Sequence, residues 1–134
     1  MLLDEIAQFL EDNHLGVVDE TIGTGRTSDA LVPQLTVYET PGSAPLQTQN
    51  SDGAAQDQPR FQVAAQAPKY ADARNLAERA YRVLITVRNE SLSGVFYLRI
   101  TAGTPPFPIG RDPNDQAKIV CNYLAVKAPS PVPA

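Results

Sequence analysis

The stretch RFQVAAQAPKYADARNLAERAYRVL, residues 60–84, changes its hydrophobic period once. In its first eight residues the larger apolar side chains, Phe61 and Val63, alternate with polar ones, which is the two-residue period of a strand. From Tyr70 onward, apolar residues recur every three or four positions, as in a helix with one buried face. These residues are Ala73, Leu76, Ala77, Ala80, Tyr81 and Leu84. Because several of them are small, we expect this helix to lie close against a sheet.

A second amphipathic helix is expected near the N-terminus, in LLDEIAQFLEDN, residues 2–13. Its helically spaced apolar residues are Leu2, Leu3, Ile6, Phe9 and Leu10. Asp4 and Glu5 lie in its first turn, where carboxylates favour the positive end of the helix dipole. Asn13 and His14, followed by Gly16, are typical of a helix C-terminus. The sequence therefore predicts a helix that ends just before residue 16.

Three further segments have strand character: LVPQLTVYET (31–40), GVFYLRIT (94–101) and KIVCNYLAV (118–126). In the second of them, Phe96, Leu98 and Ile100 are expected to share one face. Residues 17–29 are expected to be a short strand or extended piece and then a turn-rich link. The order of elements predicts an α+β fold, with a mostly antiparallel sheet of four or five strands and two helices packed on one face.

Two connections are unusual. PGSAPLQTQNSDGAAQDQP, residues 41–59, is a long polar loop, and such loops are often functional or become ordered on binding a partner. PPFPIGRDPNDQAK, residues 105–118, holds four prolines and is expected to be a stiff loop between two strands. We expect Phe107 and Ile109 to anchor it to the domain or to a neighbour. The domain is expected to span 1–128, followed by a proline-rich extended tail, 129–134.

Composition narrows the functional classes. No run approaches 18 apolar residues, so no transmembrane helix is expected, and the acidic N-terminus does not resemble a secretory signal. A single cysteine, Cys121, excludes an internal disulfide and fits a reducing compartment. Residues 1–60 hold ten acidic and two basic residues, whereas residues 61–134 hold nine basic and five acidic ones. This asymmetry is either ordinary surface charge or a pair of complementary surfaces for stacking copies of the chain.

Few residues have the pattern of a catalytic or metal site. His14 is expected to cap a helix, and Cys121 to be a small buried residue of a strand. The loop GTGRTSD, residues 23–29, lacks the lysine of a phosphate-binding loop. Asp112 and Asp115 are typical of a turn, with too few neighbouring oxygen ligands for a metal. The sequence therefore predicts no enzyme, no cofactor and no metal site.

Nucleic-acid recognition is also not expected. Arg74, Arg79 and Arg82 lie along the 70–84 helix, but Asp72 and Glu78 interrupt them. The chain is acidic overall, and it has no basic stripe with interleaved aromatic residues.

Taken in order, several motifs resemble the small tail terminator (minor capsid, tail-completion) proteins of long-tailed bacteriophages. The motifs are Tyr38-Glu39, the PRFQV of residues 59–63, the 70–84 helix, the PFPIGRD of residues 106–112 and Asn122-Tyr123. The resemblance covers most of residues 1–128. It implies a structural virion protein with a sheet flanked by helices, which agrees with the order of elements above.

The resemblance also implies partners. It predicts a hexameric ring in the tail or neck region of the virion, assembled in the host cytoplasm. The ring would cap the tail tube at its head-proximal end and present a surface to a head-completion, stopper or connector protein. DNA would pass through its lumen without specific binding, and no membrane is implied. Interface residues are expected among Arg74, Arg79, Arg82, Phe107, Ile109, Arg111 and Asp112.

Two alternatives remain open from the sequence. One is a head-completion or connector protein of related fold in the neck. The other is a small cytoplasmic enzyme or ligand-binding domain, which would need a pocket with convergent polar groups.

Overall fold

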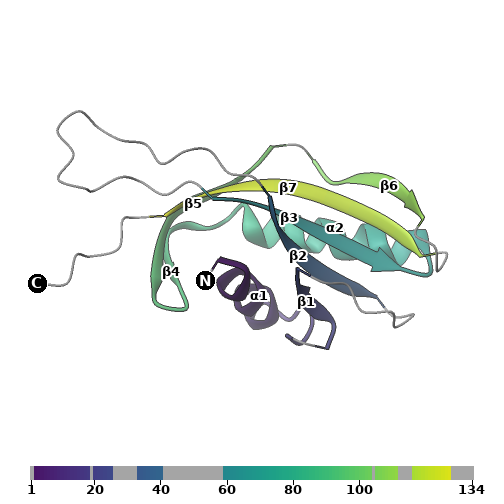
Figure 1. The fold of residues 1–134 in the computed structure, drawn as a ribbon, viewed down its shortest axis with the longest axis horizontal. Helices are drawn as coiled ribbons and strands as arrows, with labels where there is room; N and C mark the ends of the chain where they lie inside the picture. The colour runs from purple at the N-terminus through teal and green to yellow at the C-terminus, as the bar shows by residue number, and fades with distance from the viewer. Residues whose placement is uncertain are drawn as a thin grey trace, which may run out of the picture.

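The computed structural model describes residues 2–18, 20–25, 33–40, 59–103, 105–111 and 116–127 (Figure 1). The elements are α1 (Leu2–Asp12), β1 (Ile22–Thr24), β2 (Gln34–Thr40), β3 (Arg60–Ala67), α2 (Tyr70–Leu84), β4 (Arg88–Leu92), β5 (Val95–Ala102), β6 (Phe107–Arg111) and β7 (Ala117–Lys127).

The strands form one mixed sheet in the order β1-β2-β3-β7-β5-β4. Among the described strands, only β1 and β2 pair in parallel. The long strand β7 lies at the centre, with β3 along one side and both β5 and β6 along the other. The expected α+β class is confirmed. The sheet has seven strands instead of four or five, because the short strands β1, β4 and β6 have too few residues to show a clear hydrophobic period.

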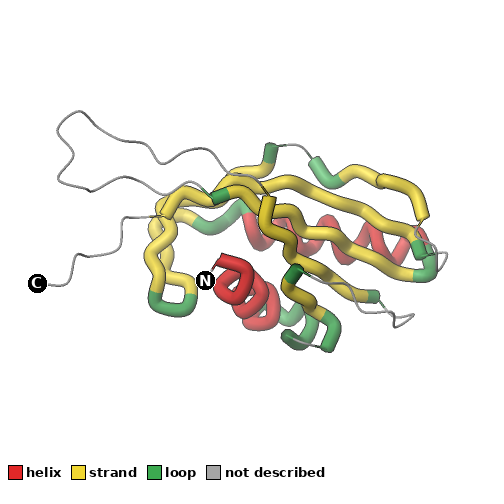
Figure 2. Tube along the Cα trace, viewed as in Figure 1, coloured by secondary structure: helices red, strands yellow, loops and turns green. Residues whose placement is uncertain are grey.

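Both helices cover the same face of the sheet, as expected (Figure 2). α2 packs on β3 and β7 through its alanine-rich stripe, in which Ala73 and Ala80 are fully buried. α1 contacts β1 and β2 at one end of the sheet order and β4 at the other end. The sheet therefore curls around α1, which closes the hydrophobic core between the two outer strands.

The C-terminus of α1 is a Schellman motif centred on His14. The amide of Leu15 donates to the carbonyl of Leu10, and the amide of His14 donates to that of Glu11. His14 has φ 63°, so it occupies the left-handed position that glycine often takes at a helix end. Gly16, just beyond, is needed for space: a Cβ there would lie 2.6 Å from Oγ1 of Thr21. The predicted helix end is confirmed, with the left-handed residue at His14.

The expected face of β5 was wrong. Phe96 is 40% exposed and Leu98 is half-buried, whereas Tyr97 is fully buried beside Ile100. The pairing with β7 shifts register between Tyr97 and Arg99. A bulge of this kind inserts one extra residue, so the side chains on its two sides do not follow a single alternation.

The segment 105–118 is only partly a loop, which corrects the sequence prediction. Residues 107–111 form β6, which pairs antiparallel with β7, with Phe107 opposite Val120 and Pro108 opposite Ile119. A proline is tolerated there because β7 is the only strand that β6 pairs with in the described sheet. Gly110 has φ 99°, where the register shifts. The predicted loop 41–58, the turn 112–115 and the tail 129–134 lie outside the described residues.

Candidate functional site

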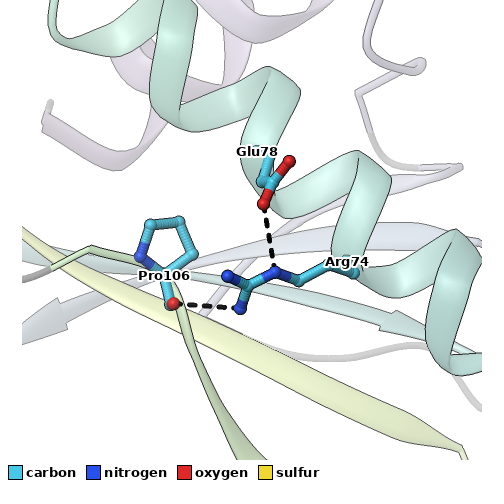
Figure 3. Close-up of polar contacts among 3 residues, drawn as sticks. All are labelled: Arg74, Glu78 and Pro106. Carbon is cyan, nitrogen blue, oxygen red and sulfur yellow. Dashed lines mark hydrogen bonds and ion pairs between the residues drawn. The ribbon is translucent and has the colours of Figure 1, made fainter.

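Arg74 joins helix α2 to the segment that leads into β6 (Figure 3). Its Nε lies 3.1 Å from Oε1 of Glu78, one turn along the helix. Its Nη1 donates a hydrogen bond of 3.1 Å to the carbonyl oxygen of Pro106. The fork of the guanidinium serves both partners at once, which an ammonium on a flexible stem does less well. Arg74 therefore positions the residues that precede Phe107 and Ile109.

The other two arginines of α2 are exposed. Arg79 donates through Nη2 to the carbonyl of His14 at 3.4 Å, which links α2 to the end of α1. Arg82 has no hydrogen-bond or ion-pair partner within the described part of the chain. The three arginines predicted as interface residues thus differ: Arg74 is engaged within its own chain, and Arg82 presents a free charge.

The two hydrophobic residues of β6 differ in the same way. Phe107 is half-buried opposite Val120, whereas Ile109 is 54% exposed. Ile109 is one of four large hydrophobic side chains that stay exposed in the described residues, with Val17, Tyr70 and Phe96. Arg111 ends β6, and its side chain lies outside the described part, as does all of Asp112.

Strand register separates the charged side chains of the sheet by face. Ile119, Cys121 and Tyr123 of β7 face the helices, so the alternate residues and their cross-strand partners form the opposite, helix-free face. The charged residues on that face in the described strands are Arg60, Arg88, Arg99 and Lys118. Glu39 and Glu90 pair with the buried Phe61 and Tyr97 and so lie on the helix side. The helix-free face is therefore basic wherever the structure describes its charges.

Two of these arginines face each other. Arg88 of β4 lies directly opposite Arg99 of β5, and both are exposed. Like charges at directly opposed positions of a hairpin destabilise it. Neither arginine has an acidic partner among the residues that the structure describes. Phe96, next to the inward-facing Tyr97, and Thr101, opposite Leu124, belong to the same face, which therefore also has apolar and polar surface.

Helix α1 has the opposite character. Its charged residues are Asp4, Glu5, Glu11 and Asp12, without a single lysine or arginine. Asp4 and Asp12 are exposed. Gln8 donates hydrogen bonds to the carboxylates of Glu11 and Asp12. The acidic surface of α1 and the basic helix-free face thus lie on different sides of the sheet, while the exposed Arg79 and Arg82 of α2 lie on the helix side.

One polar cluster was missed by the sequence analysis. Glu5 is buried, accepts a hydrogen bond of 2.6 Å from the hydroxyl of Tyr97, and lies 3.0 Å from Nζ of Lys127. Nζ also lies 5.3 Å from the centroid of the Tyr97 ring, which is a cation–π contact. Burial alone raises the pKa of Glu5, but the hydrogen bond from Tyr97 and the Lys127 ammonium more than offset it, so the pKa lies below its usual value. The sequence placed Glu5 only in the acidic first turn of the helix, with no indication of its partners Tyr97 and Lys127.

The remaining titratable candidates have structural positions. His14 caps α1 through its backbone, as described above. Cys121 is buried in β7, and burial raises the pKa of its thiol, which disfavours the reactive thiolate. Among the described residues, no three histidine, cysteine, aspartate or glutamate side chains are placed to hold a metal ion.

One hollow lies at the helix-free face. It has a volume of about 420 Å³ and is lined, within the described part, by Thr40, Arg60, Thr101, Gly103, Asn122, Tyr123 and Leu124. A second hollow of about 240 Å³ lies between α1 and the β4–β5 hairpin. Among the lining residues of the first hollow, only Arg60 brings a titratable side chain to it, because the side chain of Tyr123 lies on the helix side of β7, so this described lining holds no acid–base pair.

Residues 9–127 match the sequence profile of the bacteriophage tail terminator protein family. The chain belongs to this family. As a member of the tail terminator family, the chain is a structural component of the virion tail and is not an enzyme. Family membership agrees with the resemblance found in the sequence.

Solved structures share the fold of the tail terminator. A chain from the virion of a native gene transfer agent (GTA) particle matches with a TM-score of 0.66 at 14% identity, covering 95% of this chain and 94% of that one. A second solved structure matches with a TM-score of 0.56 at 12% identity, covering 98% and 93% of the two chains. No curated protein matched by sequence. Neither described helix is long and apolar enough to span a membrane.

Proposed function

We propose that this tail terminator assembles into a ring, most simply a hexamer, that caps the head-proximal end of the tail tube and stops its polymerisation. On its other side the ring joins the neck through a head-completion or connector protein, and DNA passes through its lumen without specific binding. The family match over residues 9–127 is the observation that carries this proposal.

A closed ring needs heterologous contacts, in which one surface of a subunit meets a different surface of the next. The acidic α1 and the basic helix-free face supply two such unlike surfaces. Because they belong to different sides of the subunit, they favour a head-to-tail arrangement over a two-fold dimer.

The proposed contact residues fall into two groups. Arg79, Arg82 and Ile109 are exposed and are proposed to meet the tail tube or a neighbouring copy. Arg74 and Phe107 are proposed to hold the β6 segment in position for that contact, because both already bind within the chain. Arg111 and Asp112, which follow Ile109 in the sequence, are proposed to contribute to the same contact. Residues 1–128 are proposed to act as one domain, since α1 contacts strands at both ends of the sheet order.

The test is assembly. Purified protein, alone and with tail tube protein, is analysed by light scattering and negative-stain microscopy. We expect rings, and we expect tubes capped at one end in the mixture. Monomers that neither form rings nor cap tubes would contradict the proposal. Labelling within the particle separates this role from that of a connector, because a terminator lies directly on the tube.

A further inference from the structure

The charges of the helix-free face are all of one sign in the described strands. Arg60, Arg88, Arg99 and Lys118 lie on this face with no carboxylate among its described residues. Lys118 already contacts the ring of Tyr38, at 5.5 Å from its centroid, and Arg60 has contacts of its own. The Arg88 and Arg99 guanidinium groups are left as the available charges at the β4–β5 end.

The opposition of Arg88 and Arg99 indicates the chemistry of a partner. Directly opposed like charges raise the free energy of the isolated hairpin. A carboxylate placed between two guanidinium groups removes this repulsion and accepts hydrogen bonds from both. Phe96, on the same strand face and 40% exposed, adds apolar surface to this hairpin. The face thus fits an acidic protein surface that also offers an apolar side chain.

Helix α1 of a second copy has these properties. Asp4 and Asp12 are exposed, and α1 contains no basic residue. Val17, which follows the end of α1, is 47% exposed and supplies the apolar side chain. Glu5 is not available for such a contact, because Tyr97 and Lys127 of its own chain occupy it. The exposed carboxylates of α1 have no lysine or arginine partner in the described part of their own chain.

We infer that the helix-free face at the β4–β5 hairpin of one subunit binds the acidic face of α1 of the next, with Arg88 and Arg99 opposite Asp4 and Asp12. This contact rests on the proposed ring and assigns its two sides. Because the two surfaces differ and lie on different sides of the subunit, the contact is heterologous and propagates around a ring. Complementary charges also fix the direction of stacking and suppress the reversed one.

The test uses charge reversal on each side. Variant A carries Arg88→Glu and Arg99→Glu, and variant B carries Asp4→Lys and Asp12→Lys. In variant A two glutamates replace two arginines at the opposed positions, so the repulsion across the hairpin is similar to that in the wild type. We therefore expect the stability of the monomer to change little. Circular dichroism and thermal melting check that both variants fold. Each alone places like charges across the contact, and we expect at least about a tenfold rise in the concentration needed for assembly.

Mixing the variants is the decisive step. In an equimolar mixture the reversed arginine side of A meets the reversed aspartate side of B, and the remaining sides are the native pair. Assembly is expected to return, in rings where A and B alternate and the number of subunits is even. The inferred contact would be wrong if variant A formed rings at wild-type concentrations, or if the mixture stayed monomeric. Neither outcome would contradict the proposal that the wild-type protein forms a ring.

A comparison variant with the same change in net charge, Arg79→Glu with Arg82→Glu, reverses the exposed basic pair of α2 that the proposed function places at the tube or at a neighbouring copy. If this comparison variant abolishes assembly and variant A does not, α2 opposes α1 and our inference is wrong. Rings of variant A that assemble normally but lose affinity for a duplex DNA probe at low salt would instead assign the face to DNA. Wild-type protein that forms no ring, even with tube protein, would overturn the proposed function itself.

Discussion

The hydroxyl of Tyr97 donates a hydrogen bond of 2.6 Å to Oε1 of Glu5, although the two residues lie 92 positions apart in the sequence. Tyr97 comes from β5 and Glu5 from α1, and Lys127 of β7 lies 3.0 Å from the same carboxylate oxygen. This cluster therefore connects helix α1 to the central strand β7 and to its neighbour β5. Such a connection couples the docking of α1 to the closing of the curled sheet.

Replacing Tyr97 with phenylalanine removes the hydrogen bond and keeps the ring. Because the acceptor is a buried carboxylate, we expect the free energy of unfolding to fall by about 1.5–3 kcal/mol. Urea unfolding measures this loss. The double variant with Glu5→Gln is expected to lose less than the two single losses combined, since the residues share one interaction. Additive losses would show that Tyr97 acts through packing alone.

The stability of the protein is expected to depend on Glu5 at acid pH. The pKa of Glu5 in the folded chain lies below the ordinary value of 4.5, so the ionised carboxylate favours the folded state. This contribution is complete above pH 4.5 and is lost as the pH falls through the lower, folded-state pKa. Thermal melting between pH 7 and pH 3 should show a smaller acid-induced decrease for Glu5→Gln than for the wild type. Equal decreases in both proteins would contradict this assignment.

Replacing Arg74 with lysine keeps the charge and removes the fork that serves Glu78 and Pro106 together. Because the side chain is partly exposed, we expect a modest loss of stability, about 0.5–1 kcal/mol. The more specific readout is hydrogen exchange, which should become faster in residues 105–111. Arg82→Lys is the matched control, and it should change neither quantity. Unchanged exchange in the β6 segment of Arg74→Lys would exclude a positioning role.

Gly16→Ala should destabilise the fold. The added Cβ would lie 2.6 Å from Oγ1 of Thr21 and 2.9 Å from Cγ1 of Ile22, which is fully buried. The turn after α1 must shift to relieve this contact, at a cost of about 1–3 kcal/mol. Gly103→Ala is the control, because its nearest contact, the carbonyl of Asn122 at 3.7 Å, is an ordinary one. Chemical denaturation of both variants compares them directly, and equal stability would contradict the prediction.

Ile109→Asp is expected to impair assembly without impairing folding. The side chain is 54% exposed, so its loss changes monomer stability by no more than about 0.5 kcal/mol. A buried aspartate at a subunit or tube contact, in contrast, lacks a partner and weakens the assembly. Light scattering and tube capping measure the effect. Tyr70→Asp, at a similarly exposed aromatic residue, is the control for a non-specific loss of exposed apolar surface.

The sequence by itself determined the elements whose hydrophobic period is long and clear. Helices α1 and α2 and the strands β2, β3 and β7 were predicted because each has a repeating hydrophobic pattern, although the structure buries residues on both faces of the three strands. The motif order was also sufficient to indicate the family, and charge counts indicated two unlike surfaces. Hydrophobic periods and motifs depend on neighbouring residues, and charge counts depend only on composition, so these properties follow from the sequence alone.

The tertiary structure decided what depends on pairing between distant segments. Because of the bulge in β5, Tyr97 and not Phe96 lies in the core. Strand β6 formed inside an expected loop because β7 pairs with it. Pairing also placed Arg88 opposite Arg99 and brought Glu5, Tyr97 and Lys127 together. Register and contacts of this kind depend on which strand lies beside which, and that is settled by burying the whole core at once.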